Sequence, residues 1–456
     1  MKKKTIELLF ILLFLVLCLI PGVGMLIFGE SEAAANEILT SKPSLTKRDG
    51  SLNTEVLSDF SDYIADRFAF RQELVTAWSW INAAVFHSSV EDQVVLGSDG
   101  WLYYSETLDD YMGIGMDDAE LEYAARNLYL MQEYAENQGA RFVFTAAPNK
   151  NSLYPENMPS GYPNGHDASN GAKLSFYLDK YGVNYSDLFS VFQGEDILYF
   201  RTDSHWNGQG AALAADSILS GLGIDSEYAS DSFSSSVCHT GDLYEMLYPA
   251  GTRTEPDPQY AAGFTYRCEN DPNGGNAITI QTKCEDGDGV LLCWRDSFGI
   301  SLYPYLAQQF GEALFSRASS YDLTQIGALG ADTVIIELVE RNLDQLITKA
   351  PVFASPVRHI SPEAESGRSL AVSVVSPKEE EAGLLQVTGE IAKSAFDPGS
   401  GIYVQLNGIT YEACVLRGSD SDFVAFSAWL PSEPVNSLKI LVYSGELLTL
   451  YDTEIQ

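Results

Sequence analysis

Residues 289–310 read GVLLCWRDSFGISLYPYLAQQF and place an apolar strand, a polar turn and a helical segment directly after one another. The run 289–294 is short and almost continuously apolar, as expected of a strand that is buried on both faces. Ser297 follows in the turn, and helical spacing of apolar residues covers 303–314. Because strand–helix steps of this kind build parallel sheets, the stretch predicts an α/β fold.

The same alternation continues on both sides of this stretch. It predicts helices at 117–138, 170–181 and 210–222, and strands at 140–148, 183–189 and 331–340. Their order along the chain predicts a parallel sheet flanked by helices, within one α/β domain over residues 55–351. Residues 225–285 interrupt the pattern and are expected to form an acidic, loop-rich insertion.

An apolar segment from residue 6 to residue 28 follows three lysines at the N-terminus. Its length suits a membrane-spanning helix, and a signal-anchor over residues 1–29 is favoured. A cleaved signal peptide is the alternative, although its apolar region is usually only about 7–15 residues long. The positive-inside rule places the rest of the chain outside a single-pass cell membrane, with residues 30–54 as a linker.

After residue 352 the pattern changes to short alternating runs, such as LLQVTGEIA and FVAFSAWL, separated by Gly, Pro and Asp. Runs of this kind predict a separate β-sandwich over residues 352–456. A sandwich core needs large side chains, so most of its aromatic residues should be buried; they include Tyr403, Tyr411, Phe423 and Trp429.

The composition excludes several classes of function. The chain carries 63 acidic and 27 basic residues, a net charge of -36, so no surplus of cations exists to neutralise nucleic-acid phosphates. Six cysteines in 456 residues are too few for a disulfide scaffold. We find no Cys or His cluster with metal-ligand spacing and no cofactor motif, so neither a metal nor a cofactor is expected.

Ser297 has two interpretations. A serine just before a helix is commonly an N-cap, which would make it structural. Alternatively, a serine at a strand-to-helix turn exposes its hydroxyl as a nucleophile, with the first N–H groups of the helix near a developing oxyanion.

Asp203 and His205 lie in the stretch RTDSHWNGQG, residues 201–210. In an extended segment residues i and i+2 point the same way, so the carboxylate can hold the Nδ1 of the imidazole and leave Nε2 free as a general base. A turn in which Asp203 caps and His205 is solvated is the alternative. If the catalytic interpretation holds, His205 Nε2 should lie within about 3.5 Å of Ser297 Oγ. The other histidines, His239 among them, are interpreted as surface residues.

Several segments occur in an order that resembles one known family. They are DRFAFRQEL (66–74), LGSDGWLYY (96–104), AAPNKNSLYP (146–155), DSHWN (203–207), TGDLYEML (240–247), DSF (296–298) and VIIELVERNL (334–343). Together they resemble the DHHW and alginate acetyltransferase (AlgX/AlgJ-type) branch of the SGNH hydrolase-like proteins, over residues 55–345. Ser204 stands where DHHW members carry their first histidine, which is closer to the acetyltransferase form.

The resemblance implies a Ser-His-Asp triad. Ser297 would be the acyl-accepting nucleophile, His205 its base and Asp203 the residue that orients the base. Each of these side chains occupies the matching position of a family motif.

Three further residues are expected to serve in oxyanion or substrate binding, two from the resemblance and one where this sequence departs from it. Tyr303 matches a tyrosine whose hydroxyl could donate to the oxyanion, and Asn149 is expected to line the site. Arg295 replaces the glycine that usually precedes Asp-Ser, and it could either crowd the turn or pair with the carboxylate of an anionic sugar.

These observations favour an extracytoplasmic O-acetyltransferase or acetylesterase that acts on a cell-surface or secreted polysaccharide. The resemblance implies a membrane O-acyltransferase as the partner that supplies acetyl groups. It also implies that the C-terminal module is a candidate carbohydrate-binding module. A non-catalytic glycan-binding or assembly protein of the cell envelope is the alternative.

Overall fold

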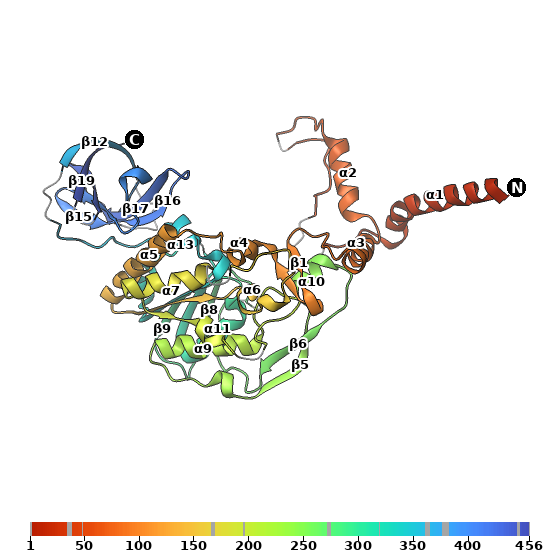
Figure 1. The fold of residues 1–456 in the computed structure, drawn as a ribbon, viewed down its shortest axis with the longest axis horizontal. Coiled ribbons are helices and arrows are strands. Elements are labelled where there is room, and N and C mark those ends of the chain that lie inside the picture. The colour runs from red at the N-terminus through yellow and green to blue at the C-terminus, as the bar shows by residue number, and fades with distance from the viewer. Residues whose placement is uncertain are drawn as a thin grey trace.

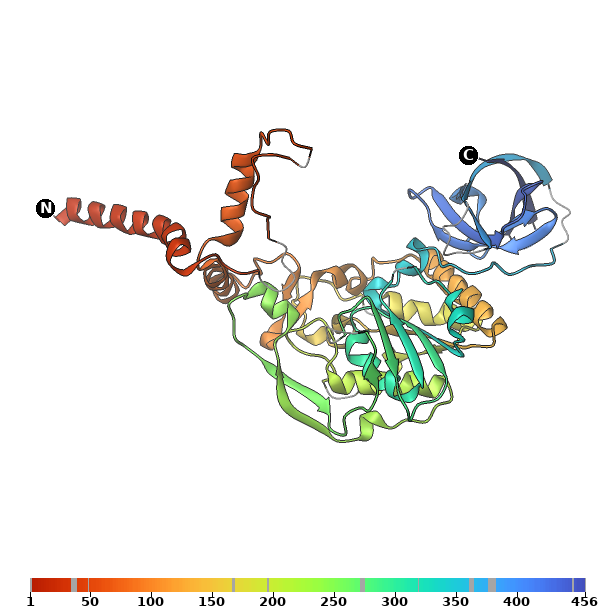
Figure 2. The same ribbon diagram turned by 180° about the vertical axis from the view of Figure 1, so that it is seen from behind.

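The protein is described by a computed structural model that covers residues 2–33, 39–47, 49–165, 169–194, 197–270, 275–318, 320–360, 365–375, 383–444 and 447–455. An α/β domain forms its centre, a C-terminal sheet packs against one side, and an N-terminal helical region extends from the body (Figures 1 and 2). Shorter elements of the α/β domain are β1 (Val94–Leu96), β2 (Leu102–Tyr104), α4 (Leu108–Tyr111), α6 (Lys150–Leu153), α8 (Leu188–Phe192), α10 (Asp242–Leu247), α12 (Gln325–Leu329) and α13 (Gln345–Thr348).

A seven-stranded sheet lies at the centre of the α/β domain. In spatial order its strands are β4 (Tyr185–Ser186), β3 (Arg141–Ala147), β11 (Thr333–Val339), β9 (Val290–Trp294), β10 (Glu312–Ser316), β8 (Thr279–Lys283) and β7 (Arg267–Cys268). The strands from β4 to β10 run parallel, as predicted.

The prediction of a wholly parallel sheet is wrong at one edge, because β8 runs antiparallel to β10 and β7 runs antiparallel to β8. Both strands belong to the insertion that was expected to be loop-rich. The short connection between β7 and β8 allows only antiparallel pairing, since a parallel pair needs a long crossover. The sheet is therefore mixed.

The central strands are apolar throughout because both faces of the sheet are covered by helices. Leu292 and Trp294 of β9 pack on the side of α5 (Asp118–Asn137) and α7 (Asn170–Tyr181). Leu291 and Cys293 pack on the other side, with α9 (Gly208–Gly221) and α11 (Gly299–Gln309). Alternate residues of one strand thus enter two different cores.

The helix predicted at 303–314 is displaced. α11 starts earlier, at Gly299, and ends at Gln309, after which Glu312–Ser316 forms β10. A short apolar run such as EALFS fits a buried helix or a buried strand equally well by periodicity, and pairing with β9 decides for the strand.

The C-terminal strands form one mixed sheet of eight. In spatial order they are β15 (Ile409–Glu412), β14 (Gly401–Leu406), β18 (Leu438–Ser444), β19 (Leu447–Ile455), β12 (Glu365–Val375), β13 (Leu384–Ala392), β17 (Phe423–Pro431) and β16 (Cys414–Arg417). Only Ala413 separates the two edge strands, so the sheet rolls until its edges meet. The predicted sandwich of two separate sheets is therefore corrected to a single rolled sheet.

The C-terminal sheet shares a core with the α/β domain. On α5, Arg126 Nε donates to Glu412 Oε1 (3.0 Å), and Asn127 exchanges hydrogen bonds with the backbone of Val415 (2.8 and 3.0 Å). One apolar cluster includes side chains from both regions. The apolar core is thus continuous between the two sheets, and the predicted domain boundary at residue 352 stays a prediction.

Most aromatic residues of this sheet are buried, as the core argument predicts. Tyr403, Tyr411 and Trp429 are buried, whereas Phe423 is 36% exposed. A buried ring is not available for stacking on a sugar. The three buried rings therefore belong to the core.

The N-terminal region contains α1 (Lys2–Phe28), α2 (Val56–Arg67), α3 (Arg71–Ile81) and the π-helical turn η1 (Asn82–Phe86). In the described part of the chain no single unbroken helix has the length and apolar character of a membrane span. The segments Lys4–Val16 and Leu19–Phe28, with a bend of 41° between them, reach the length and apolar character of a span only when they are taken together. The predicted signal-anchor stays a prediction.

Candidate active site

Ser297 lies just beyond the carboxyl end of β9, in the turn that leads into α11. Asp296 holds this turn, because its Oδ1 accepts a hydrogen bond from the N–H of Phe298 (2.9 Å) and its Oδ2 accepts from the N–H of Val339 (2.8 Å) and the amide of Asn342 (2.8 Å). The N-cap of α11 is Phe298, without a capping side chain. The capping interpretation of Ser297 therefore does not apply.

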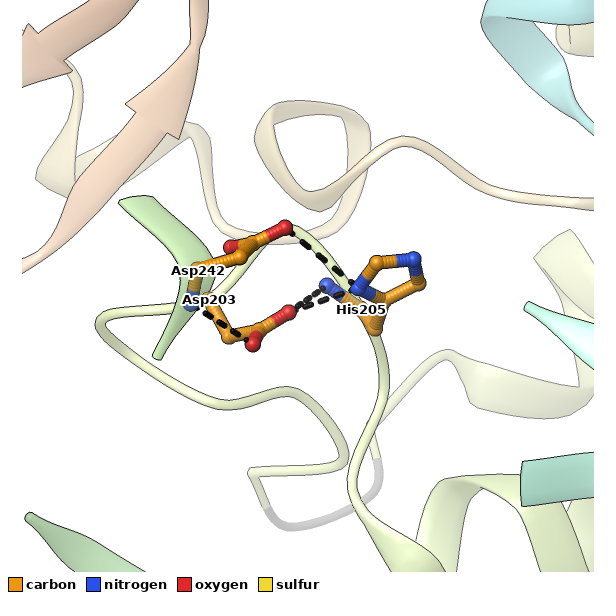
Figure 3. Close-up of side chains that lie close together, drawn as sticks. All are labelled: Asp203, His205 and Asp242. Carbon is orange, nitrogen blue, oxygen red and sulfur yellow. Dashed lines mark hydrogen bonds and ion pairs between the residues drawn. The ribbon is translucent and has the colours of Figure 1, made fainter. Parts of the chain in front are cut away.

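Ser297, His205 and Asp203 form one hydrogen-bonded chain. His205 Nε2 lies 2.8 Å from Ser297 Oγ, within the expected distance, and His205 Nδ1 lies 2.7 Å from Asp203 Oδ1. The same Oδ1 also accepts from the backbone N–H of His205 (2.9 Å), which locks the carboxylate beside the ring (Figure 3). With Nδ1–H donated to Asp203, Nε2 can accept the serine proton, which is the arrangement of an activated hydroxyl nucleophile.

The residues that follow His205 attach this loop to the helices. The buried indole of Trp206 donates to the backbone oxygen of Phe298 (3.1 Å) and to Ser301 Oγ (2.7 Å), which ties His205 to the nucleophile turn. Asn207 caps α9 by accepting from the N–H groups of Gln209 and Gly210 (both 3.0 Å). The polar stretch is thus a hydrogen-bonded loop that leads into α9.

Asp203 has a second imidazole partner. His239 Nε2 lies 2.7 Å from Asp203 Oδ2, and the His239 ring stacks on Phe200 with 4.1 Å between ring centroids. The interpretation of His239 as a surface residue is therefore wrong. It sits at the end of β5 (Phe233–His239), which pairs with β6 (Glu255–Tyr260), and β5 brings it back to the loop. Its position just before TGDLYEML was the only sequence signal.

Burial and hydrogen bonding shift the pKa values of these groups. Burial disfavours the charged carboxylate, but hydrogen bonds from His205 and His239 outweigh it and hold the pKa of Asp203 well below its usual range. Burial likewise disfavours the charged imidazoles, yet the bond to Asp203 and its charge raise the pKa of both His205 and His239. A raised pKa makes His205 a stronger base.

Asp242 is a second acidic neighbour of His205. Its Oδ2 lies 3.6 Å from His205 Nδ1 and accepts a hydrogen bond from Ser204 Oγ (2.6 Å), and its N–H donates to Asp203 Oδ2 (2.9 Å) (Figure 3). Ligand atoms of Asp203, His205 and Asp242 lie within 4.8 Å of one another. Since these atoms already bond to one another and to Ser204, the cluster is accounted for without an ion.

A cavity of about 240 Å³ opens at Ser297 and is lined by Arg295, Arg317, Tyr321 and Asn342 among others. Arg295 borders this cavity but is buried, and its Nη2 donates to the backbone oxygens of Gly275 (2.7 Å) and Ala277 (3.1 Å). The arginine therefore holds the 275–277 segment through Nη2, and its Nη1 donates to the backbone oxygen of Asp296 (3.2 Å), so two of the nitrogens expected to face an anionic sugar bind the protein instead.

Tyr303 and Asn149, expected to bind the oxyanion and to line the site, are both buried. Tyr303 lies on α11, largely buried, with its ring between those of Tyr266 (6.0 Å) and Phe315 (5.5 Å). Asn149 is fully buried, and its amide donates to Asp110 Oδ2 (2.9 Å). A fully buried amide does not reach a substrate, so the predicted lining role of Asn149 does not fit its position.

Two cations lie near the site, and of these Lys150 was not singled out from the sequence. Lys150 is buried, and its Nζ donates to the backbone oxygens of Phe200, Arg201 and Asp203, while burial lowers its pKa to about 8. The guanidinium of Arg341 lies 5.5 Å from the ring centroid of Phe298. Lys150 fixes the backbone of the Asp203 loop, and its position in AAPNKNSLYP was the available signal.

Residues 94–277 match the family model described as the SGNH hydrolase-like domain of the acetyltransferase AlgX. The match contains Asp203 and His205 and ends before Ser297. Two relatives are named probable alginate O-acetylase AlgJ. The protein from Pseudomonas syringae pv. tomato is 28% identical over 159 residues, which cover 34% of this chain and 39% of the relative. The protein from Pseudomonas fluorescens is 26% identical over 218 residues, 46% of this chain and 51% of the relative.

The chain thus spans between two fifths and about half the length of these relatives. Among solved structures, Bacillus cereus PatB1 with a sulfonyl adduct has a TM-score of 0.44 at 17% identity, covering 56% of this chain and 98% of that one. The O-acetyltransferase domain of Pseudomonas putida AlgJ has a TM-score of 0.37 at 18% identity, covering 55% and 91%. The family match and the two sequence relatives confirm the predicted resemblance to the AlgX/AlgJ-type SGNH hydrolase-like family, which the family model places at residues 94–277.

Proposed function

We propose that the chain is an extracytoplasmic serine O-acetyltransferase that modifies hydroxyl groups of a cell-surface or secreted polysaccharide. The observation that carries the proposal is the hydrogen-bonded chain from Asp203 through His205 to Ser297. The AlgX-type family match and the relatives named alginate O-acetylase support acetyl transfer as the reaction.

The first half of the reaction forms an acetyl-enzyme. Ser297 Oγ attacks the carbonyl carbon of an acetyl donor while His205 Nε2 takes the hydroxyl proton, and Asp203 stabilises the imidazolium. The N–H groups at the start of α11 are candidate donors to the oxyanion, with the Tyr303 hydroxyl as the side chain that the resemblance implies. The tetrahedral intermediate collapses, and the leaving alkoxide takes the proton from His205.

The second half transfers the acetyl group. His205 removes a proton from a sugar hydroxyl, the oxygen attacks the acetyl-Ser297 carbonyl, and the proton returns to Ser297 Oγ as the ester bond to the serine breaks. Water in place of the sugar gives hydrolysis, which makes acetylesterase activity the companion reaction. A membrane O-acyltransferase is the proposed supplier of acetyl groups, and α1 is the proposed membrane anchor.

The test is covalent labelling with an aryl sulfonyl fluoride, followed by intact-protein mass spectrometry. The wild type should gain one adduct at Ser297, and Ser297→Ala should gain none. Ser175→Ala, at a half-buried serine of α7 whose hydroxyl donates to the backbone oxygen of Ala172, is the matched control and should label normally. A wild type that stays unlabelled but binds polysaccharide would support the alternative, a non-catalytic glycan-binding protein of the cell envelope.

A further inference from the structure

α3 and η1 carry a stripe of exposed apolar side chains. Leu74, Trp78, Ile81 and Val85 follow one another at intervals of four, three and four residues, the spacing of one helix face. All four are exposed, Trp78 at 57% and Val85 at 63%. Trp80 (64%) and Phe86 (65%) are exposed as well, although helical spacing places them beside this stripe rather than on it. A contiguous patch of this kind is uncommon on a surface that faces only water.

The opposite side of the same helix is attached to the α/β domain. Ser79 is buried, and Thr76 Oγ1 accepts a hydrogen bond from the N–H of Ala250 (2.9 Å). Ala83 and His87 border a cavity of about 450 Å³ together with Tyr244 and other residues near α10. The helix is therefore held in place by one side, and its apolar stripe points away from the domain.

The stripe is continuous with the end of α1. The rings of Phe28 and Phe70 meet edge to face at 5.4 Å, and a Cβ at Gly24 would lie 2.7 Å from Ala69 Cβ. In Figures 1 and 2 α3 lies at the base of α1, where α1 joins the body. If α1 enters a bilayer, Phe70 lies where the chain leaves it, and α3 begins at the membrane surface.

We propose that α3 and η1 form an interfacial helix that lies in the surface of the lipid bilayer and holds the α/β domain against it. The proposal rests on membrane anchoring through α1, which is part of the proposed function. A lipid surface fits better than a partner protein, because tryptophan is enriched at the membrane–water boundary and an amphipathic helix buries its apolar face there. Because Phe70 contacts the end of α1, the stripe would lie at the membrane–water boundary once α1 is in the bilayer.

The tryptophans offer a direct readout in the full chain. Of the six, Trp101, Trp206, Trp294 and Trp429 are buried, so Trp78 and Trp80 are the two that a lipid can reach. The full chain is reconstituted into phosphatidylcholine vesicles whose acyl chains are either brominated or plain. We expect the brominated lipid to quench part of the fluorescence, and the Trp78→Phe/Trp80→Phe variant to lose that quenching.

A variant with negative charges on the stripe distinguishes the proposed lipid contact from anchoring by α1. In Leu74→Glu/Ile81→Glu/Val85→Glu we expect quenching to be lost while the chain still floats with the vesicles. Phe176→Glu, at a 67% exposed position on α7, is the control and should keep both properties.

Three results would overturn the proposal. The first is that the wild type floats with the vesicles but has equal tryptophan fluorescence in brominated and plain lipid. The second is that brominated lipid still quenches the fluorescence of the variant with three glutamates. The third is that aqueous acrylamide quenches Trp78 in vesicles until a second membrane protein is added, because a partner protein rather than lipid would then cover the stripe. A chain that does not float contradicts the anchoring by α1 as well, whereas the labelling of Ser297 tests catalysis independently.

Discussion

His239 Nε2 and Asp203 Oδ2 lie 2.7 Å apart, so the carboxylate that holds His205 is shared between two imidazoles. His205 uses Oδ1 and His239 uses Oδ2, and the N–H of Asp242 also donates to Oδ2 (2.9 Å). Each donor lowers the proton affinity of the carboxylate. A protonated His239 would also place a positive charge near His205. His239 is therefore expected to be a positioning residue that adjusts the basicity of His205.

Replacement of His239 should change both the pH at which esterase activity falls and the maximum value of kcat/KM. His239→Gln keeps a neutral donor but removes the titrating charge, so the acid limb of kcat/KM should move to higher pH while the rate at high pH stays near wild type. His239→Ala removes the donor as well, which should reduce kcat/KM roughly ten- to a hundredfold, as expected for a lost hydrogen bond to a charged group. An acid limb that stays in place in His239→Gln would show a merely structural role.

Wild-type activity should depend on pH through His205. The general base acts only when neutral, and its pKa is raised above the ordinary value of 6.5 because the bond to Asp203 outweighs burial. The kcat/KM for a small acetyl ester should therefore fall as the pH drops through a value above 6.5. An acid limb centred below 6.5 would contradict the charge-stabilised imidazole.

Loss of a member of the proposed triad should abolish most turnover. Because such residues act as a unit, Ser297→Ala should lower kcat by roughly 10⁴- to 10⁶-fold, and Asp203→Asn, which favours the wrong tautomer of His205, by roughly 10³- to 10⁴-fold. Hydrolysis of a chromogenic acetyl ester measures both, and circular dichroism checks that the variants are folded. Near-normal rates in Ser297→Ala would refute the proposed nucleophile.

Trp206 should matter through its indole N–H rather than through its size. Trp206→Phe keeps an aromatic ring in the core but removes the donor to Phe298 and Ser301, which loosens the link between His205 and the nucleophile turn. We expect a fall in kcat of roughly tenfold, in line with about 1–1.5 kcal/mol for one hydrogen bond, with KM little changed. A rise in KM with unchanged kcat would place Trp206 in substrate binding instead.

The buried ion pair between α5 and the C-terminal sheet should dominate the stability of that contact. Arg126→Gln leaves Glu412 buried with only Arg358 as a charged partner, so the free energy of unfolding should fall by about 3–5 kcal/mol. Arg417→Gln, which removes a more exposed pair with Glu120, is the matched control and should cost less than about 1 kcal/mol. Chemical denaturation measures both, and equal losses would contradict a shared core.

The local architecture could be predicted from the amino-acid sequence. The apolar run 289–294, the turn at Ser297 and the helices at 117–138 and 170–181 follow from hydrophobic periodicity, which reports burial along one segment. The pairing of Asp203 with His205 was predictable because both lie in one short stretch. The extended segment expected there is wrong, since residues 201–205 form bends in which the N–H of His205 also donates to Asp203 Oδ1.

Contacts between residues far apart in the sequence became visible only in the folded protein. Sequence patterns carry no information about which distant segments pack together, so the hydrogen bond between His239 and Asp203, the burial of Asn149 and the use of Arg295 on the 275–277 segment could not be predicted. The rolled C-terminal sheet depends on both edges meeting around Ala413. The antiparallel edge of the central sheet depends on the pairing of β8 with β10 and of β7 with β8. Such contacts are set by the packing of whole elements, in which long-range geometry outweighs local propensity.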